Sequence, residues 1–432
     1  MRTSECGDAA SKRIPSRSPL DGLAADEPWV DAVEAFRARN PRRRDRIADY
    51  ERILAGGAHR RIGEAVLAGR YRPAPPAESW LNKADGRKKR LFLYPPADEL
   101  LFRVVNRLMQ PAAVEAASPW CTSFLPGGGA RASFRRVLTD PHAETKAALR
   151  LDLRDYFNSI DVRHLLAGLP ASFTTGPMGA LLRASLLDAR VVRRGCIIDG
   201  GRKGVMAGTP LAPMLATLYL RDLDREIGDT GLTYARYSDD FLVLAPPADV
   251  PGLDALVRAR LCERGLEVNE QKSTAVAPGL PWDFLGFRYA ERRVALAPVT
   301  ERKLAAKTTR LARRLLRRRE QAALPIDDTV RAFSRRTNRR LYGVPAERAD
   351  FSWATWFLPL LDDACGLERL DGHVQREARY AATGRRRPRV HALVPYTVLR
   401  DAGYLPLVAA FWAAKEGPAS YDALVARRTG LP

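Results

Sequence analysis

The sequence predicts an α+β fold, and two kinds of periodicity support this prediction. Residues 148–153 and 232–237 alternate apolar with polar side chains, which is typical of half-buried strands, and residues 241–244 form a short apolar strand candidate. Residues 211–225 and 302–342 instead carry apolar side chains at helical spacing. The last two strand candidates flank a tight turn, so we expect a hairpin with acidic residues at its tip. Strands clustered in the middle of the chain, with helices on both sides, indicate an α+β protein.

The N-terminal part is predicted to be a helical extension. Residues 1–28 are polar and are expected to form a mobile tail. From residue 29 to 69 apolar residues recur at helix-like intervals, and a proline and a glycine pair divide them into two or three short helices. The breaker sequence at 73–76 marks a boundary. We therefore expect residues 1–75 to form the N-terminal helical extension.

The segments on either side of the acidic hairpin combine strand and helix signals. Residues 90–94 are strand-like, residues 98–110 favour a helix, and three glycines at 127–129 indicate a loop. Towards the C-terminus, aromatic residues from Phe351 to Trp412 have the spacing of buried helix anchors. We favour a place in the core over base stacking for these aromatic side chains.

Composition narrows the class of partner. The 432 residues include 71 lysines and arginines against 50 aspartates and glutamates, a formal net charge of +21. This surplus predicts a polyanionic partner, with nucleic acid first. The longest apolar stretch is about half of the ~20 residues that a bilayer span needs, and the N-terminus has no signal-peptide core. We expect a cytoplasmic protein with no membrane partner, and its oligomeric state stays open.

Carboxylates are the candidate metal ligands, because five scattered cysteines and five scattered histidines fit neither a disulfide framework nor a zinc site. The alternation around Asp152 directs its carboxylate away from the apolar face of its strand. Asp239 and Asp240 are adjacent in the hairpin turn. Aspartate is common in turns because it tolerates turn geometry, but two neighbouring carboxylates repel each other unless a cation neutralises them. Carboxylate oxygens suit Mg²⁺, and paired ions would activate a hydroxyl nucleophile.

The middle of the chain contains five motifs in order: LRLDLRDYFNSID, GVMAGTPLAPMLATLYLRDLD, YSDD, NEQKS and FLGF. In this order they resemble the palm motifs of reverse transcriptases. Upstream, RKKRLFLYPPADELLFRVV and SFLPGGGARASFRRV are similar to the fingers blocks of bacterial group II intron-like reverse transcriptases. The segment from Phe351 to Trp412 is similar to the tail of group II-like and defence-associated bacterial reverse transcriptases. The resemblance implies a right-hand polymerase, with fingers and palm at 76–300, a basic helical thumb at 301–345 and a C-terminal helical region at 346–432.

The resemblance also implies roles for the acidic residues. Asp152 would bind two Mg²⁺ ions, with Mn²⁺ as an alternative, and the carbonyl of Leu153 would be a further ligand. Asp239 would be the second main metal-binding carboxylate, and Asp240 would complete the catalytic triad. Lys272 matches the lysine that donates a proton to the departing pyrophosphate, although an ordinary surface lysine explains this residue equally well.

Four residues would bind the incoming nucleotide. Lys89 and Arg90 resemble the residues that grip the triphosphate, whereas the plainer interpretation is a solvated basic face. Phe157 falls at the sugar-gate position, where an aromatic ring excludes a 2′ hydroxyl; the alternative is a core aromatic. Gly208 belongs to the loop that passes under the base pair. Ala207 stands where most relatives have glutamine, which puts fidelity and template preference in doubt.

Two further features would contact the template and primer. Phe284 and Gly286 resemble the hairpin that supports the primer end. No acid interrupts the residues from 303 to 319, and their cations at helical spacing fit a thumb helix on duplex phosphates. A solvated helix face is the plainer interpretation. The residues of this stripe assigned to nucleic acid are Arg310, Arg313, Arg314 and Arg317.

The sequence therefore predicts an RNA-directed DNA polymerase that uses an RNA template, a DNA or RNA primer and dNTPs. We expect its template to be a dedicated structured RNA and its role to be bacterial antiphage defence. One alternative is an endonuclease-lacking group II intron or another retroelement enzyme. A second is an RNA-binding scaffold whose palm does not polymerise, and a third is a template-independent or ribonucleotide-using polymerase. The intact acids argue against the scaffold, and Phe157 argues against ribonucleotides.

Overall fold

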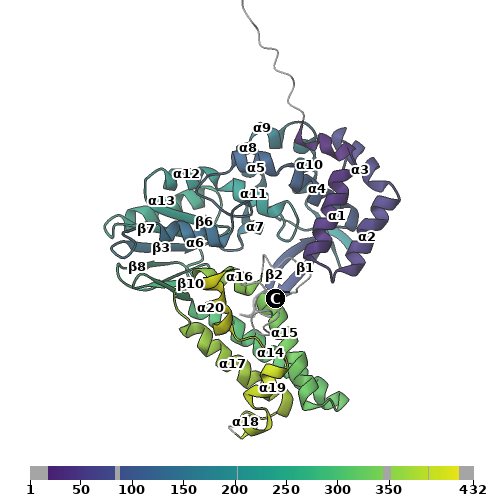
Figure 1. The fold of residues 1–432 in the computed structure, drawn as a ribbon. Helices are drawn as coiled ribbons and strands as arrows, with labels where there is room; N and C mark the ends of the chain where they lie inside the picture. The colour runs from purple at the N-terminus through teal and green to yellow at the C-terminus, as the bar shows by residue number, and fades with distance from the viewer. Residues whose placement is uncertain (1–17, 83–87, 202, 344–351, 388, 418–432) are drawn as a thin grey trace, which may run out of the picture. The chain divides into compact units, whose positions relative to one another are not determined.

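The computed structural model describes residues 18–82, 88–201, 203–343, 352–387 and 389–417. The fold is α+β, as predicted, and Figure 1 labels its elements in chain order. Two compact units alternate along the chain. Unit 1 takes its residues from 1–37, 42–117 and 157–219, and unit 2 takes them from 38–41, 118–156 and 220–432.

Unit 1 contains a four-stranded sheet in the order β2-β1-β4-β5 and is otherwise helical. β1 and β2 form an antiparallel hairpin in which Trp80 lies opposite Arg90. The elements of unit 1, with α1 and α7 reaching its borders, are η1 (Pro19–Ala24), α1 (Glu27–Arg39), α2 (Arg44–Ala55), α3 (Ala58–Leu67), β1 (Ala77–Asn82), β2 (Lys88–Leu93), α4 (Pro96–Leu108), α5 (Gln110–Ala116), α7 (Tyr156–Ser159), α8 (Val162–Gly168), α9 (Ala171–Thr174), α10 (Gly176–Leu186), β4 (Arg190–Arg193), β5 (Cys196–Asp199) and α11 (Ala212–Tyr219).

The N-terminal helices α1, α2 and α3 confirm the helical prediction for residues 29–69. The expected tail is wrong from residue 19 onward, because η1 begins there behind the capping side chain of Ser18. Leu20 and Leu23 of η1 are buried, and α3 and α4 pack against this short helix. These two leucines anchor the segment in the core. The prediction missed this because the surrounding residues are polar and composition does not show which side chains are buried. Residues 1–17 of the expected tail lie outside the described residues.

Unit 2 contains the aspartate-bearing sheet, in the order β6-β7-β3-β8, and a second sheet in the order β11-β10-β9. α6 packs against β6, and α13 packs against β3. The elements of unit 2 are α6 (Ala130–Leu138), β3 (Ala147–Asp152), α12 (Arg221–Gly228), β6 (Thr233–Tyr237), β7 (Asp240–Ala245), α13 (Val250–Glu263), β8 (Thr274–Val276), β9 (Trp282–Phe284), β10 (Phe287–Ala290), β11 (Arg293–Leu296), α14 (Pro298–Ala322), α15 (Ile326–Tyr342), α16 (Trp353–Phe357), η3 (Leu358–Leu360), α17 (Cys365–Thr383), α18 (Val390–Leu393), α19 (Tyr396–Asp401) and α20 (Leu407–Glu416).

The predicted strands are confirmed to within two residues, and two predicted helices are interrupted. The helix expected at 211–225 is α11 followed by α12, with a break at Leu220, whose φ of −105° and ψ of 11° leave the helical range. The helix expected at 302–342 is α14 followed by α15, with Pro325 between them. Proline signals the second break, whereas the fully buried Leu220 carries no breaker signal.

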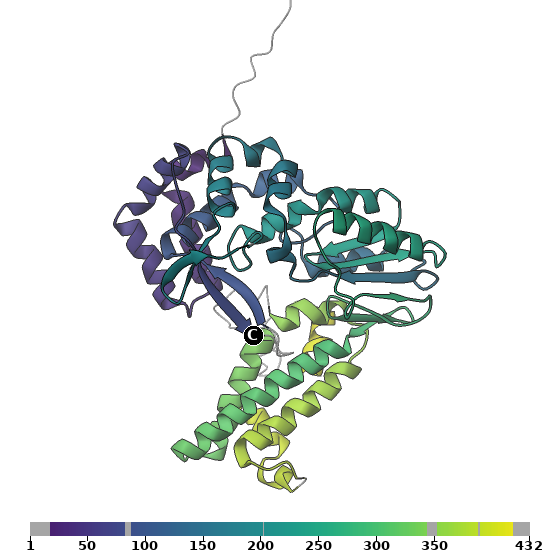
Figure 2. The same cartoon turned by 180° about the vertical axis from the view of Figure 1, so that it is seen from behind.

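A helical bundle of α14, α15 and α17 forms the C-terminal part of unit 2 (Figures 1 and 2). Its core contains Leu311 and Leu315 of α14, Phe333 of α15 and Val374 of α17. Because α14 buries one stripe of side chains, its remaining faces are free to carry charge.

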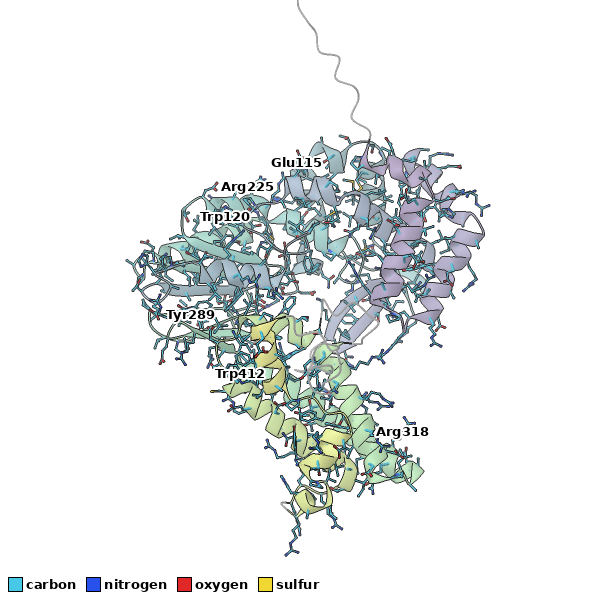
Figure 3. All side chains as sticks on the ribbon, viewed as in Figure 1. Glu115, Trp120, Arg225, Tyr289, Arg318 and Trp412 are labelled. Atoms are coloured by element: carbon cyan, nitrogen blue, oxygen red, sulfur yellow. The ribbon has the colours of Figure 1, made fainter. Side chains whose placement is uncertain are left out.

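The prediction for the C-terminal aromatic residues holds in part. Tyr404 is buried in the core of the bundle, and Trp353 and Trp356 pack against the larger core of unit 2. Trp412 is 60% exposed on α20 (Figure 3) and Tyr396 is 44% exposed on α19, so the core assignment is wrong for both. Phe351 lies outside the described residues.

No helix within the described ranges combines the length and the apolar character that crossing a bilayer requires.

Candidate active site

Three aspartates lie at neighbouring ends of two paired strands in unit 2. β3 and β7 are antiparallel, and their register places Asp152 directly opposite Asp240. The two-residue turn between β6 and β7 contains Ser238 and Asp239. The backbone N–H of Leu153 donates a hydrogen bond of 3.0 Å to the carbonyl of Asp239, which ties this turn to the end of β3. Strand register thus brings together two acids, Asp152 and Asp240, that are 88 residues apart in the sequence.

Asp152 is almost fully buried, at 3% exposure, and both oxygens of its carboxylate have polar partners. Lys272 Nζ lies 3.0 and 2.9 Å from the two carboxylate oxygens, and the Asn269 side-chain amide donates to Oδ1 at 2.9 Å. The backbone N–H of Asn269 also donates to the carbonyl of Asp152 at 2.7 Å. The predicted proton donor Lys272 therefore belongs to this site, where its charge offsets that of Asp152.

Asp240 is paired with Arg150, whose side chain lies on the same face of the sheet as Asp240. Arg150 lies two residues before Asp152, so its side chain is a diagonal neighbour of Asp240, and its Nη2 donates to Asp240 Oδ1 at 3.0 Å. The pKa of Asp240 nevertheless lies above its usual value, because burial and the charge of Asp152 outweigh the Arg150 guanidinium.

The pKa of Asp239 is also raised, first by burial and then by the charges of Asp240 and Asp152. The carboxylates thus hold more negative charge than Lys272 and Arg150 offset, and a bound cation would relieve the excess. Hard carboxylate oxygens are the ligands that Mg²⁺ prefers, so the donor set fits a divalent ion. Among the described residues, however, no three acidic, histidine or cysteine side chains converge to hold one ion. Lys272 and Arg150 engage two of the three carboxylates, so ion binding would require these side chains to rearrange.

In unit 1, three of the four predicted nucleotide-binding residues lie in one cluster. Lys89 Nζ sits 5.5 Å from the centre of the Phe157 ring, a cation–π contact. Gly208 has a φ of +101°, and an added Cβ would lie 3.2 Å from the carbonyl of Phe92 and 3.6 Å from Cβ of Leu91. Glycine is required there by both conformation and space. Phe157 is half-buried, which leaves part of its ring accessible.

Arg90 lies on the opposite face of β2 from Lys89, as alternation dictates. Its Nε donates to Glu78 Oε1 at 2.8 Å, and its Nη2 donates to the carbonyl of Gly200 at 2.7 Å. The Glu78 side chain is only 1% exposed and also pairs with Arg193. The structure therefore places the Arg90 side chain in a partly buried ion pair, on the other face of β2 from Lys89.

Asn158 is a residue of this cluster that the sequence analysis missed. Its side-chain amide donates to the carbonyl of Arg90 at 3.1 Å and accepts from the N–H of Ala207 at 3.1 Å. The N–H of Phe92 donates to the carbonyl of Ala207 at 2.9 Å. One side chain thus links β2 to the loop that contains Gly208. Its position directly after Phe157 was the available signal, but polar residues are common there and the two partners are distant in sequence.

Phe284 and Gly286 serve packing within unit 2. Phe284 is fully buried, and a Cβ added to Gly286 would lie 2.8 Å from Thr300 Oγ1 and 3.0 Å from the Phe357 ring. The carbonyl of Gly286 accepts hydrogen bonds from the Ala297 N–H and the Thr300 hydroxyl. This turn lies against the start of α14 and against α16, which accounts for the glycine without reference to a primer.

The basic stripe of α14 is partly enclosed by α15. A cavity of about 550 Å³ is lined by cationic side chains of both helices: Lys307, Arg310, Arg313, Arg314, Arg317 and Arg340. Burial lowers the pKa of Arg340, and the nearby Arg314 and Arg310 lower it further. The pKa of Arg336 is also lowered, first by burial and then by the charge of Arg318. Arg318 is labelled on α14 in Figure 3. Cations crowded so closely favour a multivalent anion.

Similarity to known proteins covers the segment that contains both clusters. Residues 84–289 match the family described as reverse transcriptase (RNA-dependent DNA polymerase). The chain is 30% identical over 281 residues to the retron Mx65 reverse transcriptase of Myxococcus xanthus, which covers 57% of this chain and 64% of that protein. It is also 32% identical over 145 residues to a homocitrate synthase of Frankia sp., covering 31% and 35% of the two chains.

The chain thus spans less than two thirds of the length of either curated relative. Among solved structures, apo telomerase from Candida Tropicalis aligns with 77% of this chain and 66% of its own, at 11% identity and a TM-score of 0.43.

Proposed function

We propose that this chain is a reverse transcriptase, an RNA-directed DNA polymerase whose reaction takes place at Asp152, Asp239 and Asp240. The observation that carries the proposal is the β3–β7 register, which sets Asp152 opposite Asp240 within the segment that matches the reverse transcriptase family. Only a specific pairing turns acids from two distant motifs into one cluster.

Divalent ions, with Mg²⁺ first and Mn²⁺ second, would supply activation of the primer hydroxyl and neutralisation of the leaving pyrophosphate. Asp152 and Asp239 would be the main ligands, with the Leu153 carbonyl and Asp240 completing the set. Lys272 now balances the charge of Asp152. Its side chain is 53% exposed, so it would leave this contact to donate a proton to pyrophosphate, the role that the resemblance implies.

In this proposal β1 and β2 belong to the fingers and the aspartate-bearing sheet to the palm, within 76–300, while α14 and α15 form the thumb at 301–345. Residues 1–75 and 346–432 are the N- and C-terminal helical regions. Lys89 would bind the triphosphate and Phe157 would exclude a 2′ hydroxyl, which selects dNTPs. Arg90 would contribute only if its pair with Glu78 opened.

The cationic cavity between α14 and α15 supports the assignment of Arg310, Arg313, Arg314 and Arg317 to the template–primer duplex. We further propose a dedicated structured RNA as template and a role in antiphage defence. The similarity to a retron reverse transcriptase supports the alternative proposal, a retroelement enzyme.

One observation favours the second candidate, an RNA-binding scaffold: Lys272 and Arg150 already engage two of the three carboxylates. The variant Asp239→Asn separates the two functions, because it removes a carboxylate without adding charge. Asp229→Asn, at an exposed position after α12, is the matched control.

A polymerase predicts that Asp239→Asn abolishes dNTP incorporation on an RNA template, with RNA affinity within about twofold of wild type because phosphate contacts dominate affinity. Asp229→Asn should leave both quantities unchanged. A scaffold predicts no templated incorporation by the wild-type chain either.

A further inference from the structure

The residue that precedes Asp239 has an unusual backbone conformation. Ser238 has a φ of +61°, in the left-handed region that non-glycine residues rarely occupy. It is 7% exposed, so water cannot readily satisfy its backbone groups. Such a conformation persists only where surrounding contacts hold it, and it occurs often at functional sites.

Both backbone polar groups of Ser238 are bound by buried side chains. Its N–H donates to Ser123 Oγ at 2.5 Å, and its carbonyl accepts from Arg236 Nη1 at 3.0 Å. Ser123 and Arg236 are both 0% exposed. Ser123 and Arg236 therefore hold the turn that contains Asp239 by hydrogen bonds to both backbone polar groups of Ser238.

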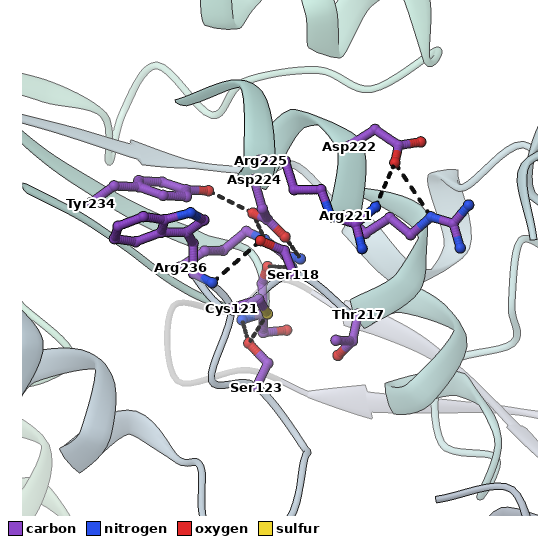
Figure 4. A network of polar contacts seen from close by, with 12 residues as sticks. Ser118, Cys121, Ser123, Thr217, Arg221, Asp222, Asp224, Arg225, Tyr234 and Arg236 are labelled. Carbon is purple, nitrogen blue, oxygen red and sulfur yellow. Dashed lines mark hydrogen bonds and ion pairs between the residues drawn. The ribbon is translucent and has the colours of Figure 1, made fainter. Parts of the chain in front are cut away.

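Arg236 is itself fixed by a buried ion pair, drawn in Figure 4. Its Nε and Nη2 donate to the two oxygens of Asp224 at 2.7 and 2.5 Å, and Tyr234 donates its hydroxyl to the same carboxylate at 2.6 Å. Burial alone would lower the pKa of Arg236, but the Asp224 carboxylate more than offsets this and holds the pKa well above its usual value. The guanidinium stays charged, and its planar fork binds Asp224 and Ser238 at the same time.

We propose that Arg236, oriented by Asp224, is a positioning residue that fixes the carboxylate of Asp239 through the Ser238 carbonyl. This inference rests on the proposed function, since Asp239 is a metal-binding residue only in that function. A merely structural role predicts instead that loss of the contacts lowers stability and activity together. The two roles differ in how metal affinity and kcat change at a given loss of stability.

Arg236→Lys keeps the charge but cannot bind both Asp224 oxygens and the Ser238 carbonyl at once. Tyr234→Phe is the matched control, because it removes one hydrogen bond to Asp224 and leaves the contacts of Arg236 in place. Ser123→Ala is a second test variant, because it removes the acceptor on the other side of Ser238. Each is compared with wild type as the full chain, by Mn²⁺ affinity from electron paramagnetic resonance, dNTP kcat and KM on an RNA template, and thermal midpoint.

For Arg236→Lys we expect Mn²⁺ affinity about tenfold weaker, as is typical when the support of a ligand is lost. We expect kcat lower by about 100-fold, with the dNTP KM within about threefold of wild type, since misplacement acts on the reacting groups. Ser123→Ala should likewise weaken Mn²⁺ affinity and lower kcat, here by about tenfold, while the dNTP KM stays close to wild type. Tyr234→Phe should lower the thermal midpoint and leave Mn²⁺ affinity and kcat within about twofold.

Wild-type Mn²⁺ affinity and kcat in a folded Arg236→Lys chain would overturn the proposal. If that variant does not fold, a Ser123→Ala chain with unchanged Mn²⁺ affinity and kcat overturns it. Equal losses of kcat in Tyr234→Phe and Arg236→Lys also contradict it, because they indicate a structural role. Asp239→Asn in the same assay keeps the two hypotheses apart: if Asp239→Asn is inactive while Arg236→Lys behaves as wild type, only the positioning role fails.

Discussion

At the scale of single residues, the environment of each charge decides what that residue can do. Lys89 and Arg90 are adjacent and chemically alike, yet one contacts the Phe157 ring and the other is paired with buried Glu78. The sequence cannot separate them, because the partner of Arg90 is set by the register of β1 and β2. The same holds for Lys272, whose contact with Asp152 depends on folding across 120 residues.

Lys89→Ala and Arg90→Ala should therefore fail in different ways. Lys89→Ala should raise the dNTP KM about tenfold by removing a charge that would bind triphosphate, with an unchanged thermal midpoint. Arg90→Ala leaves the buried Glu78 with one cation fewer, and should cost about 1–3 kcal/mol of unfolding free energy. Steady-state kinetics and chemical denaturation measure the two effects. A stable Arg90→Ala chain with a raised KM would show that Arg90, too, binds nucleotide.

The raised pKa of Asp239 makes a prediction about stability in the absence of metal. A carboxyl group whose pKa is higher in the folded state stabilises the fold while protonated, below its unfolded value of 3.8, and this contribution is lost as the pH rises through the folded value. At pH 7, Asp239→Asn should therefore raise the thermal midpoint by about 1–3 °C. Calorimetry in EDTA at pH 7 tests this, and a lower midpoint for the variant would show that Asp239 is not under charge repulsion.

At the scale of elements, periodicity predicted the strands well because alternation is a local property of the chain. β3 and β6 appear where the alternation of residues 148–153 and 232–237 places them, and β7 appears at the apolar run of residues 241–244. The break at Leu220 was missed, since a buried leucine is an ordinary helix residue and the break depends on tertiary packing. The sequence does not reveal that Gly286 lies against Thr300 and Phe357 of the same chain, and its contact with a primer stays a prediction.

The α14–α15 cavity makes a prediction about salt dependence. Arg310→Ala should weaken binding of an RNA–DNA duplex to a similar extent for all sequences, and should reduce the slope of log affinity against log salt concentration by about 1. Arg331→Ala is the matched control, because this exposed arginine of α15 pairs with Asp328 instead of lining the cavity. Filter binding at several salt concentrations measures both slopes. Equal slopes for Arg310→Ala and wild type would place the duplex elsewhere.

At the scale of the whole molecule, the net charge of +21 predicted a polyanionic partner without saying where it binds. The structure divides the cations among different roles. Arg90 and Arg236 form ion pairs with buried carboxylates, Lys272 and Arg150 balance the aspartates, and the α14 stripe faces a cavity. The motif order predicted the aspartate cluster, because each acid lies in a recognisable local pattern. The residues that hold the cluster in place were not predicted. Asp224, Ser123 and Asn269 act through contacts with residues distant in sequence, which no local pattern reveals.

The most direct test of the central claim is extension of a DNA primer on an RNA template by the full chain, measured with dNTPs and Mg²⁺. The proposal predicts extension that stops on addition of EDTA and that falls by at least about 1,000-fold in Asp239→Asn, since loss of a metal-binding carboxylate removes several kcal/mol of transition-state stabilisation. Extension by Asp239→Asn at the wild-type rate, or extension that persists in EDTA, would contradict it.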